Sequence, residues 1–110
     1  MATEPDGWAA LVEYLYGVMR TQAENPGLRA LYRVQGSTNP ALRDCRALIE
    51  PWVQQVIDLA HQQGTLRSDF TFDDVIYIQI ALIGVIDASP AEAPHLYERH
   101  LALFIDGMRA

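Results

Sequence analysis

The segment from Val75 to Ile86 constrains the fold more than any other part of this sequence, because Gln79 is its only polar residue. It is shorter than the roughly 20 apolar residues that a bilayer-spanning helix needs. A helix that is apolar on every side must be covered by its neighbours on several sides. With 110 residues, half of them hydrophobic, the chain has the size and composition of one globular domain. We therefore expect this segment to be a buried helix of a single domain.

Four further segments carry apolar residues at intervals of three and four, as amphipathic helices do. They run over about 7–23, over a short stretch that begins at Asn25-Pro26, over about 41–63, and from Pro94 to the C-terminus. Residues 36–40 and 89–94 are loops by composition. Because no stretch alternates apolar and polar residues, we predict an all-α fold of five helices with antiparallel packing.

Local signals mark several helix ends. Asp6 is a plausible N-cap, and Gly64 is placed to be a C-cap. Thr71 and Asp74 have the spacing of an N-terminal capping box, with Asp in place of Glu. Pro51 interrupts the 41–63 segment, where its missing N–H and its ring should kink or split the helix.

Charge and motif content exclude several functions. A net charge of −6 disfavours contact with a phosphate backbone, so we expect this segment not to bind nucleic acid. The acidic start resembles no signal peptide, which predicts a cytoplasmic protein with no membrane contact. Cys45 lies on the apolar stripe of its helix, where we expect a buried, inert thiol. Because metal-ligand, redox and phosphate-loop motifs are lacking, we predict no catalytic residues, metal or cofactor, and hence no enzyme.

Large aromatic side chains come from several of the predicted helices, and Pro51 lies beside one of them. Rings with polar tips often line pockets for small molecules. The alternative, that these rings simply fill the core, remains open. On the first reading, a small apolar or aromatic effector would bind between the first four helices. The expected lining is Trp8, Leu11, Tyr14, Leu15, Val18, Leu31, Trp52, Val56, Tyr77 and Ile80.

The last two helices carry more apolar surface than one copy of the chain could cover. In the segment after Pro94, apolar residues spread over more than half of the helix circumference. A large bare patch would favour aggregation, and pairing with a second copy would remove it. We therefore expect a homodimer in which these helices form a four-helix bundle. The expected interface is Gln79, Leu82, Ile86, His100, Leu101, Phe104, Ile105 and Met108.

The residues that join and end the last helices carry a family resemblance. Ala60, Gly64, Leu66, Arg67, Asp69 and Asp74 match an A-x-x-x-G-x-L-R-x-D-x-x-x-x-D pattern found in TetR-type transcriptional regulators. The ending from Arg99 to Ala110 is similar to the R-x-L-x-L-x-x-D-G-L-R-A ending of that family's regulatory domains, and Asn25-Pro26-Gly27-Leu28 resembles its N-P-x-L motif. The nearest subgroup is the SbtR-like C-terminal domain. Pro51 departs from the family pattern.

This resemblance implies a bacterial C-terminal domain, covering residues 1–110, that binds an effector and dimerises. The helix-turn-helix domain through which the full-length regulator would bind DNA is expected to be absent, because only about seven residues precede the first helix. The alternative function is a helical protein–protein interaction module without a ligand. A homodimer with an apolar side pocket favours the regulator, whereas a monomer that pairs with another protein favours the alternative.

Overall fold

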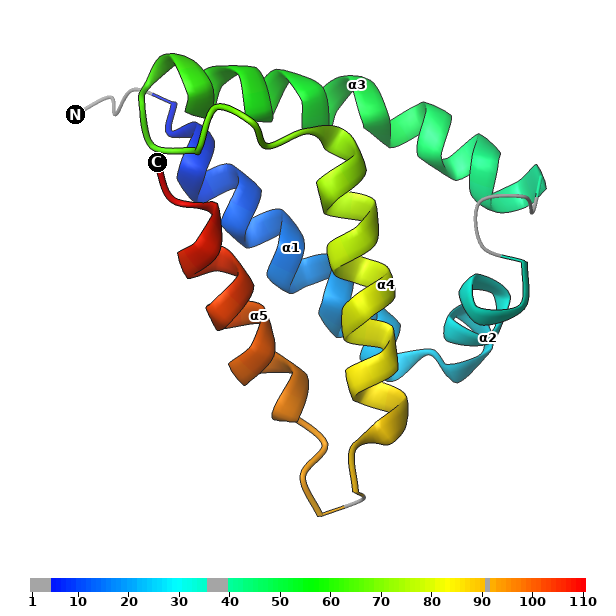
Figure 1. Cartoon of the computed structure of the whole chain (residues 1–110). Helices are drawn as coiled ribbons and strands as arrows, with labels where there is room; N and C mark the ends of the chain where they lie inside the picture. Colours follow the sequence, from blue (N-terminus) through cyan, green and yellow to red (C-terminus); the bar gives the residue numbers. More distant parts are fainter. Residues whose placement is uncertain (1–4, 36–39, 91) are drawn as a thin grey trace.

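The described part of the chain folds into five α-helices (Figure 1). The computed structural model describes residues 5–35, 40–90 and 92–110, without the side chains of 31–35, 41 and 42. Residues 36–39 of the predicted 36–40 loop and position 91 of the predicted 89–94 turn lie outside the described residues, while Pro40 begins α3. The helices are α1 (Gly7–Glu24), α2 (Pro26–Gln35), α3 (Pro40–Gln62), α4 (Phe72–Ala88) and α5 (Leu96–Met108). This confirms the all-α prediction.

The predicted helix-end signals are present. The Asp6 Oδ1 atom accepts a hydrogen bond from the Ala9 N–H at 3.1 Å, which caps α1. At the start of α4, the Thr71 N–H donates to Asp74 Oδ2 at 2.8 Å in the capping box. Gly64 follows α3 with a φ of 74°, a conformation that costs a glycine little.

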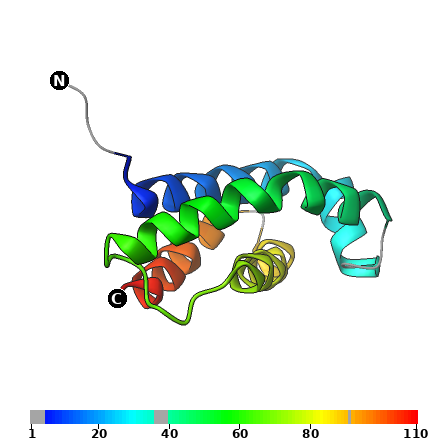
Figure 2. The same cartoon turned by 90° about the horizontal axis from the view of Figure 1, so that it is seen from above.

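The core lies between two layers of helices. In Figure 1, α4 and α5 form the front layer and α1 crosses behind them, while Figure 2 shows α3 running alongside α1. Gly7 permits the close approach of α1 to α3, because a Cβ there would lie 2.4 Å from the Ala60 backbone nitrogen. The fully buried apolar side chains come from both layers: Leu11, Leu15, Met19, Val53, Ile57, Ala60, Val75, Leu82 and Leu101.

Ion pairs tie α4 to its neighbours at both ends. Near its start, Arg46 of α3 contacts Asp73 at 2.9 Å and lies 5.0 Å from the centre of the Phe72 ring. Near its end, Arg29 of α2 contacts Asp87 at 3.1 Å and also donates to backbone carbonyls at the end of α1. These contacts hold α2 and α3 on the same side of α4.

The N-terminal half of α3 bears on two expectations. Of the kink or split expected at Pro51, the structure excludes the split, because the helix runs unbroken through this residue. Both Pro51 and Ala47 are exposed, so water can bind the carbonyl that the missing N–H leaves without a partner. Cys45 is exposed rather than buried. The physical reason is that burial on α3 begins only at Val53, where the helix packs on α1.

Among the described residues, no helix combines the length and the apolar character that crossing a membrane requires.

Candidate functional site

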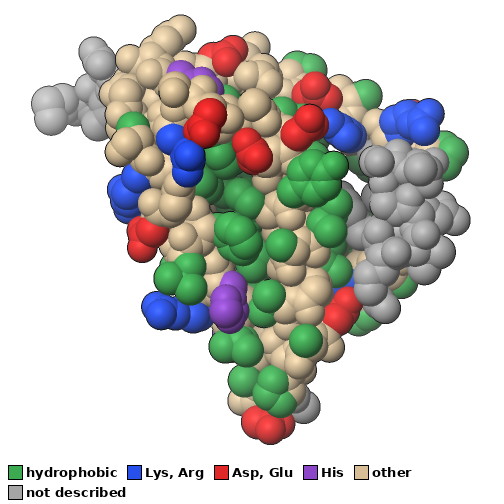
Figure 3. Space-filling model, in the orientation of Figure 1, with side chains coloured by type: hydrophobic (Ala, Val, Ile, Leu, Met, Phe, Trp, Pro, Cys, Tyr) green, Lys and Arg blue, Asp and Glu red, His purple; other side chains and the backbone are tan. Residues whose placement is uncertain are grey.

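The outward side of α4 and α5 carries apolar residues that the single chain leaves exposed. On α4 they follow one stripe at intervals of three and four, and on α5 they follow another. The α4 stripe is Tyr77, Ala81, Gly84 and Ala88. The α5 stripe is Leu96, Leu103, Phe104 and Gly107, together with the polar, half-buried His100. Neither stripe contains Asp, Glu, Lys or Arg. Figure 3 shows hydrophobic side chains gathered along the junction of the two helices. We call these two stripes together the outer face.

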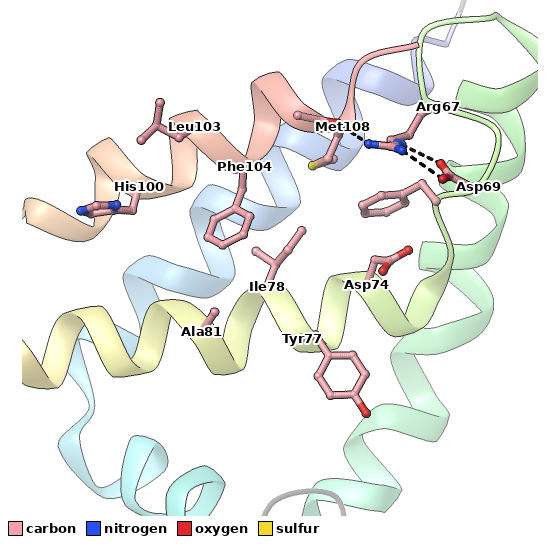
Figure 4. Close-up of a pocket in the computed structure, with 12 residues that line it drawn as sticks. Arg67, Asp69, Asp74, Tyr77, Ile78, Ala81, His100, Leu103, Phe104 and Met108 are labelled. Atoms are coloured by element: carbon pink, nitrogen blue, oxygen red, sulfur yellow. Dashed lines mark hydrogen bonds and ion pairs between the residues drawn. The ribbon is translucent and has the colours of Figure 1, made fainter.

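A groove of about 840 Å³ runs along the outer face between α4 and α5. Phe104 reaches from α5 towards Ile78 of α4 on its floor (Figure 4). Arg67, Asp69 and Asp74 border the groove at one end, and His100 lines it further along α5. The groove is therefore apolar along its length, with charged groups concentrated at one end.

The loop between α3 and α4 holds the end of α5. Arg67 donates to both carboxylate oxygens of Asp69, at 2.6 and 3.0 Å, and to the Gly107 carbonyl at 3.2 Å. The Arg67 backbone N–H also donates to the Met108 carbonyl at 2.9 Å. The hydrogen bond from Arg67 holds the pKa of Asp69 below its usual range, and the same bond raises the pKa of Arg67. Arg67 and Asp69, which both belong to the A-x-x-x-G-x-L-R-x-D pattern, therefore fix the end of the groove.

Glycines on the outer face leave room for another backbone. A Cβ built at Gly84 or at Gly107 would meet no other atom within 4 Å. The contrast is Gly7, where a Cβ would collide with α3. Small residues at a helix surface allow a second helix to approach closely.

The predicted interface residues divide between the core and the outer face. His100 and Phe104 lie on the outer face, and Phe104 is 40% exposed. The structure places the others elsewhere: Gln79, Leu82, Leu101, Ile105 and Met108 are buried within the chain, and Ile86 is half-buried against the core. Those buried positions are a correction, because all of them except Met108 pack into the chain's own core, while Met108 is buried at the charged end of the groove.

A second candidate surface lies where α1, α3 and α4 meet. The rings of Tyr14 on α1 and Trp52 on α3 are tilted against each other, with centroids 5.6 Å apart. Trp52 nevertheless remains 45% exposed, so its ring is available to a ligand. Val18 continues the Tyr14 side of α1 one turn further and is half-buried. We call this surface the aromatic site.

The side of α4 that faces the aromatic site is apolar between two ion pairs. Asp73, Ile76, Ile80, Ile83 and Asp87 follow one another at intervals of three and four, so they form a single stripe. Asp73 and Asp87 contact α3 and α2 respectively, which shows that this stripe faces those helices. Ile76 and Ile80 between them are only partly buried. They therefore extend the aromatic site along α4.

Only part of the predicted ligand-binding set comes together here. Tyr14, Val18, Trp52 and Ile80 border the aromatic site, while Leu11, Leu15 and Val56 are buried in the core. Trp8 lies at the other end of α1, with the Arg109 guanidinium 4.7 Å from its ring centre. Tyr77 is 67% exposed and borders the outer-face groove, with its ring directed away from α5. The Leu31 side chain lies outside the described part. The expected ligand-binding set therefore does not come together as one lining, and Trp8 is set apart from Trp52.

Sequence reasoning missed several residues of the outer face. Leu96, Leu103 and Ala81 are part of the outer face and are absent from the expected interface. The signal that could have found them is the spacing of small and apolar residues along α4 and α5. That signal is weak, because nearly all the remaining residues of α4 are apolar as well.

No group of three or more metal-binding side chains comes together within residues 5–35, 40–90 and 92–110.

The described residues thus form an all-α domain of five helices with an apolar outer face on the last two. The family model described as the C-terminal domain of SbtR-like transcriptional regulators matches residues 6–110. The chain therefore belongs to this family, which confirms the resemblance seen in its motifs. A comparison with curated proteins finds no match to the chain.

Proposed function

We propose that this chain senses a small apolar or aromatic effector and pairs with a second copy of itself, as the regulatory domain of a TetR-type regulator. The observation that carries the proposal is the outer face, where two adjacent helices expose apolar side chains and the charged groups Arg67, Asp69 and Asp74 are concentrated at one end. Membership of the regulator family supports the same reading.

Homodimerisation through the outer face is proposed on physical grounds. Stable interfaces commonly remove about 800 Å² or more from each partner, and the chain has a total surface of 6849 Å². Two adjacent helices can supply an area of that size. The exposed Leu103 and Phe104 would fill the grooves of the other copy, and the open Gly84 and Gly107 would admit its backbone. Burying apolar area contributes about 25 cal/mol per Å² before the costs of association.

Sedimentation equilibrium at low micromolar protein tests the dimer. We expect a mass of about 25 kDa, twice the chain mass of 12.3 kDa. Phe104→Glu and Ala81→Arg place a charge on the outer face and should give monomers with unchanged helical circular dichroism, because both side chains are exposed in the single chain. A wild-type mass near 12 kDa would contradict the dimer and favour an interaction module that pairs with a different protein.

Leu48→Glu is the matched control for these variants. Leu48 is an exposed apolar residue on α3 (83% exposed), away from the outer face. It should leave the dimer intact. Dissociation by Leu48→Glu as well would show that added negative charge, rather than its position, separates the copies.

Effector binding at the aromatic site is proposed from its side chains. Tyr14 and Trp52 present rings, and Ile76 and Ile80 present aliphatic surface, all partly accessible. Such a lining suits an apolar or aromatic body. Because the neighbouring charges of Arg46 and Arg29 are paired with Asp73 and Asp87, the site offers no obvious counter-ion to a charged ligand.

The two indole N–H groups of the chain allow a direct test with toluene as the probe. In ¹H–¹⁵N spectra, toluene should shift the Trp52 indole signal in a saturable way and leave the Trp8 signal unchanged, because Trp8 lies beside Arg109 at the end of α5. Trp52→Ala should weaken the saturable shifts of backbone signals in α1 and α4. An unsaturated, equal drift of both indole signals would argue against a binding site.

The same helix would link the two proposed activities. One side of α4 borders the aromatic site, and the adjoining side forms part of the outer face. A ligand that shifts α4 would thereby change how two copies pair, which is how an effector could alter the spacing of DNA-binding domains in a full-length bacterial regulator acting in the cytoplasm.

A further inference from the structure

His100 lies at the centre of the apolar stripe on α5. Leu96 precedes it by about one turn, and Leu103 and Phe104 follow it by about one turn. Its side chain is half-buried and lines the groove between α5 and α4 (Figure 4). A second copy that covered this stripe would therefore cover the imidazole of His100 as well.

His100 is also the residue of the outer face that can change charge near neutral pH. The two stripes contain no Asp, Glu, Lys or Arg, and Tyr77 is their only other titratable residue. A phenol ordinarily loses its proton at about pH 10, whereas an imidazole gains one between about pH 8 and about pH 5. Mild acidification therefore adds positive charge to these stripes at His100 alone.

On the side of α4 and the loop before it, the charged groups of the groove lie at its far end from His100 (Figure 4). Arg67 and Asp69 are paired there at 2.6 Å, and Asp74 accepts a hydrogen bond in the capping box. The remaining carboxylates of α4 form ion pairs with α2 and α3 on another side of the helix. No described group on this side of the groove therefore contacts His100 with a charge.

The charged side chains of α5 and α1 lie beside the outer face rather than within it. All of them are exposed, and those near α5 on α1 act on Tyr97, which is buried on the inward side of α5. They are Arg20 and Glu24 on α1, and Glu98, Arg99 and Asp106 on α5. Among the described residues, none forms an ion pair or a hydrogen bond with the His100 side chain. The same chain thus offers no partner that would stabilise an imidazolium at this position.

We propose that His100 makes the pairing of two copies through the outer face depend on pH, with a neutral imidazole buried in the dimer and a protonated one favouring separate chains. This inference rests on the proposed function, since it assigns the regulation of the same interface. Two copies related by two-fold symmetry present the same surface to each other, so the stripes of the other copy supply no carboxylate either. Burial disfavours a charged group that has no partner far more than it disfavours the neutral form.

Proton linkage gives the direction and the size of the effect. A group that binds its proton more weakly in the dimer leaves pairing at full strength above its free-chain pKa, and it weakens pairing as the pH falls below that value. For an imidazole of ordinary pKa, about 6.5, a fall from about pH 7.5 to about pH 5.5 costs about tenfold in pairing strength. Because a dimer contains two such groups, the expected loss is about 100-fold.

Sedimentation equilibrium at these two pH values, at one ionic strength, measures the Kd of the dimer. We expect the wild-type Kd to rise about 100-fold at the lower pH while helical circular dichroism stays unchanged. His100→Gln keeps a neutral polar side chain at both pH values, so its Kd should change by less than about threefold. His100→Asn is the second neutral variant, for use if the glutamine disturbs the fold.

The other two histidines of the chain provide matched controls, because histidine is the side chain that ordinarily titrates in this interval. His95 is exposed and contacts Glu98 at 3.6 Å, and His61 on α3 contacts the Arg67 carbonyl oxygen at 3.0 Å. His95→Gln and His61→Gln should therefore keep the wild-type rise in Kd. Persistence of the rise in His100→Gln, or its loss in a control instead, would overturn the assignment to His100.

The outcomes separate this inference from the proposed function. A wild-type monomer at both pH values and low micromolar protein would overturn the dimer, and this inference with it. A dimer of equal or greater strength at the lower pH would leave the proposed dimer in place and overturn the role of His100, since the ring would then lie outside the interface or meet a carboxylate of the other copy.

Discussion

Gly7 sets how closely α1 and α3 approach each other. A Cβ at this position would lie 2.4 Å from the Ala60 nitrogen and 2.9 Å from the Val56 carbonyl oxygen. Both are backbone atoms of a helix, so they cannot turn aside as a flexible side chain could. A larger residue must push the two helices apart, and every buried contact between them would loosen.

We therefore expect Gly7→Ala to lower the free energy of unfolding by about 2 kcal/mol, the usual cost of overpacking a close contact. Urea denaturation measures the change. Gly17→Ala is the control within the same helix, because a Cβ there meets nothing within 4 Å. It should raise stability by about 0.5–1 kcal/mol through helix propensity. Equal effects of the two substitutions would contradict the close approach.

The Arg67–Asp69 pair gives a second test at the residue scale. Because Arg67 donates to the Asp69 carboxylate, Asp69 should titrate below the ordinary range of aspartates in carboxyl-detected NMR, and Arg67→Gln should move its pKa back towards the ordinary value. Stability from a depressed carboxyl pKa is present above the unfolded-state pKa and is lost as the pH falls through the folded-state value. Since both side chains are exposed, we expect little change in overall stability. A normal Asp69 pKa in the wild type would contradict the pair.

At the scale of elements, α3 combines a packed C-terminal half with an exposed N-terminal half. Burial begins at Val53, while the described side chains before it are exposed or half-buried. Pro51 lies at this boundary and removes one backbone hydrogen bond from the helix. The N-terminal half should therefore open more readily than the rest of the helix.

Pro51→Ala should restore the missing hydrogen bond to Ala47. We expect the local opening free energy of residues 43–50 to rise by about 1–3 kcal/mol, measured by native-state hydrogen exchange. Gln55→Ala, an exposed change on the same helix, should alter it by less than about 0.5 kcal/mol. Unchanged or faster exchange in Pro51→Ala would contradict this expectation, because it would mean that Pro51 does not lower the local opening free energy of this half of α3.

At the scale of the whole molecule, the charge is net negative, at −6. Protein–DNA affinity rests largely on cations that replace the counter-ions of the phosphate backbone. We expect the chain alone to retain no DNA in a mobility-shift titration at low salt, whichever sequence is used. Sequence-selective retention at submicromolar protein would overturn this expectation and would require a reading surface that this acidic domain does not offer.

Much of the helical layout could be predicted from the sequence because its signals are local. Intervals of three and four mark amphipathic helices, and caps such as Asp6, Gly64 and the Thr71–Asp74 box act within a turn of their own position. The contact between Tyr14 and Trp52 also agrees with the expectation that aromatic side chains from different helices converge. The family was recognisable because its motifs lie in the junction and the ending that hold α5 in place.

Only the tertiary structure decided which sides of the helices face inward. A helix that is apolar all round carries no directional signal, so Gln79, Leu82 and Leu101 were expected to face a partner and instead face the core. The exposure of Cys45 was equally inaccessible to sequence reasoning, because burial along α3 depends on how far α1 extends beneath it. The spacing of apolar residues indicates that a helix has an apolar side. Only the packing of neighbouring helices determines how much of that side is covered.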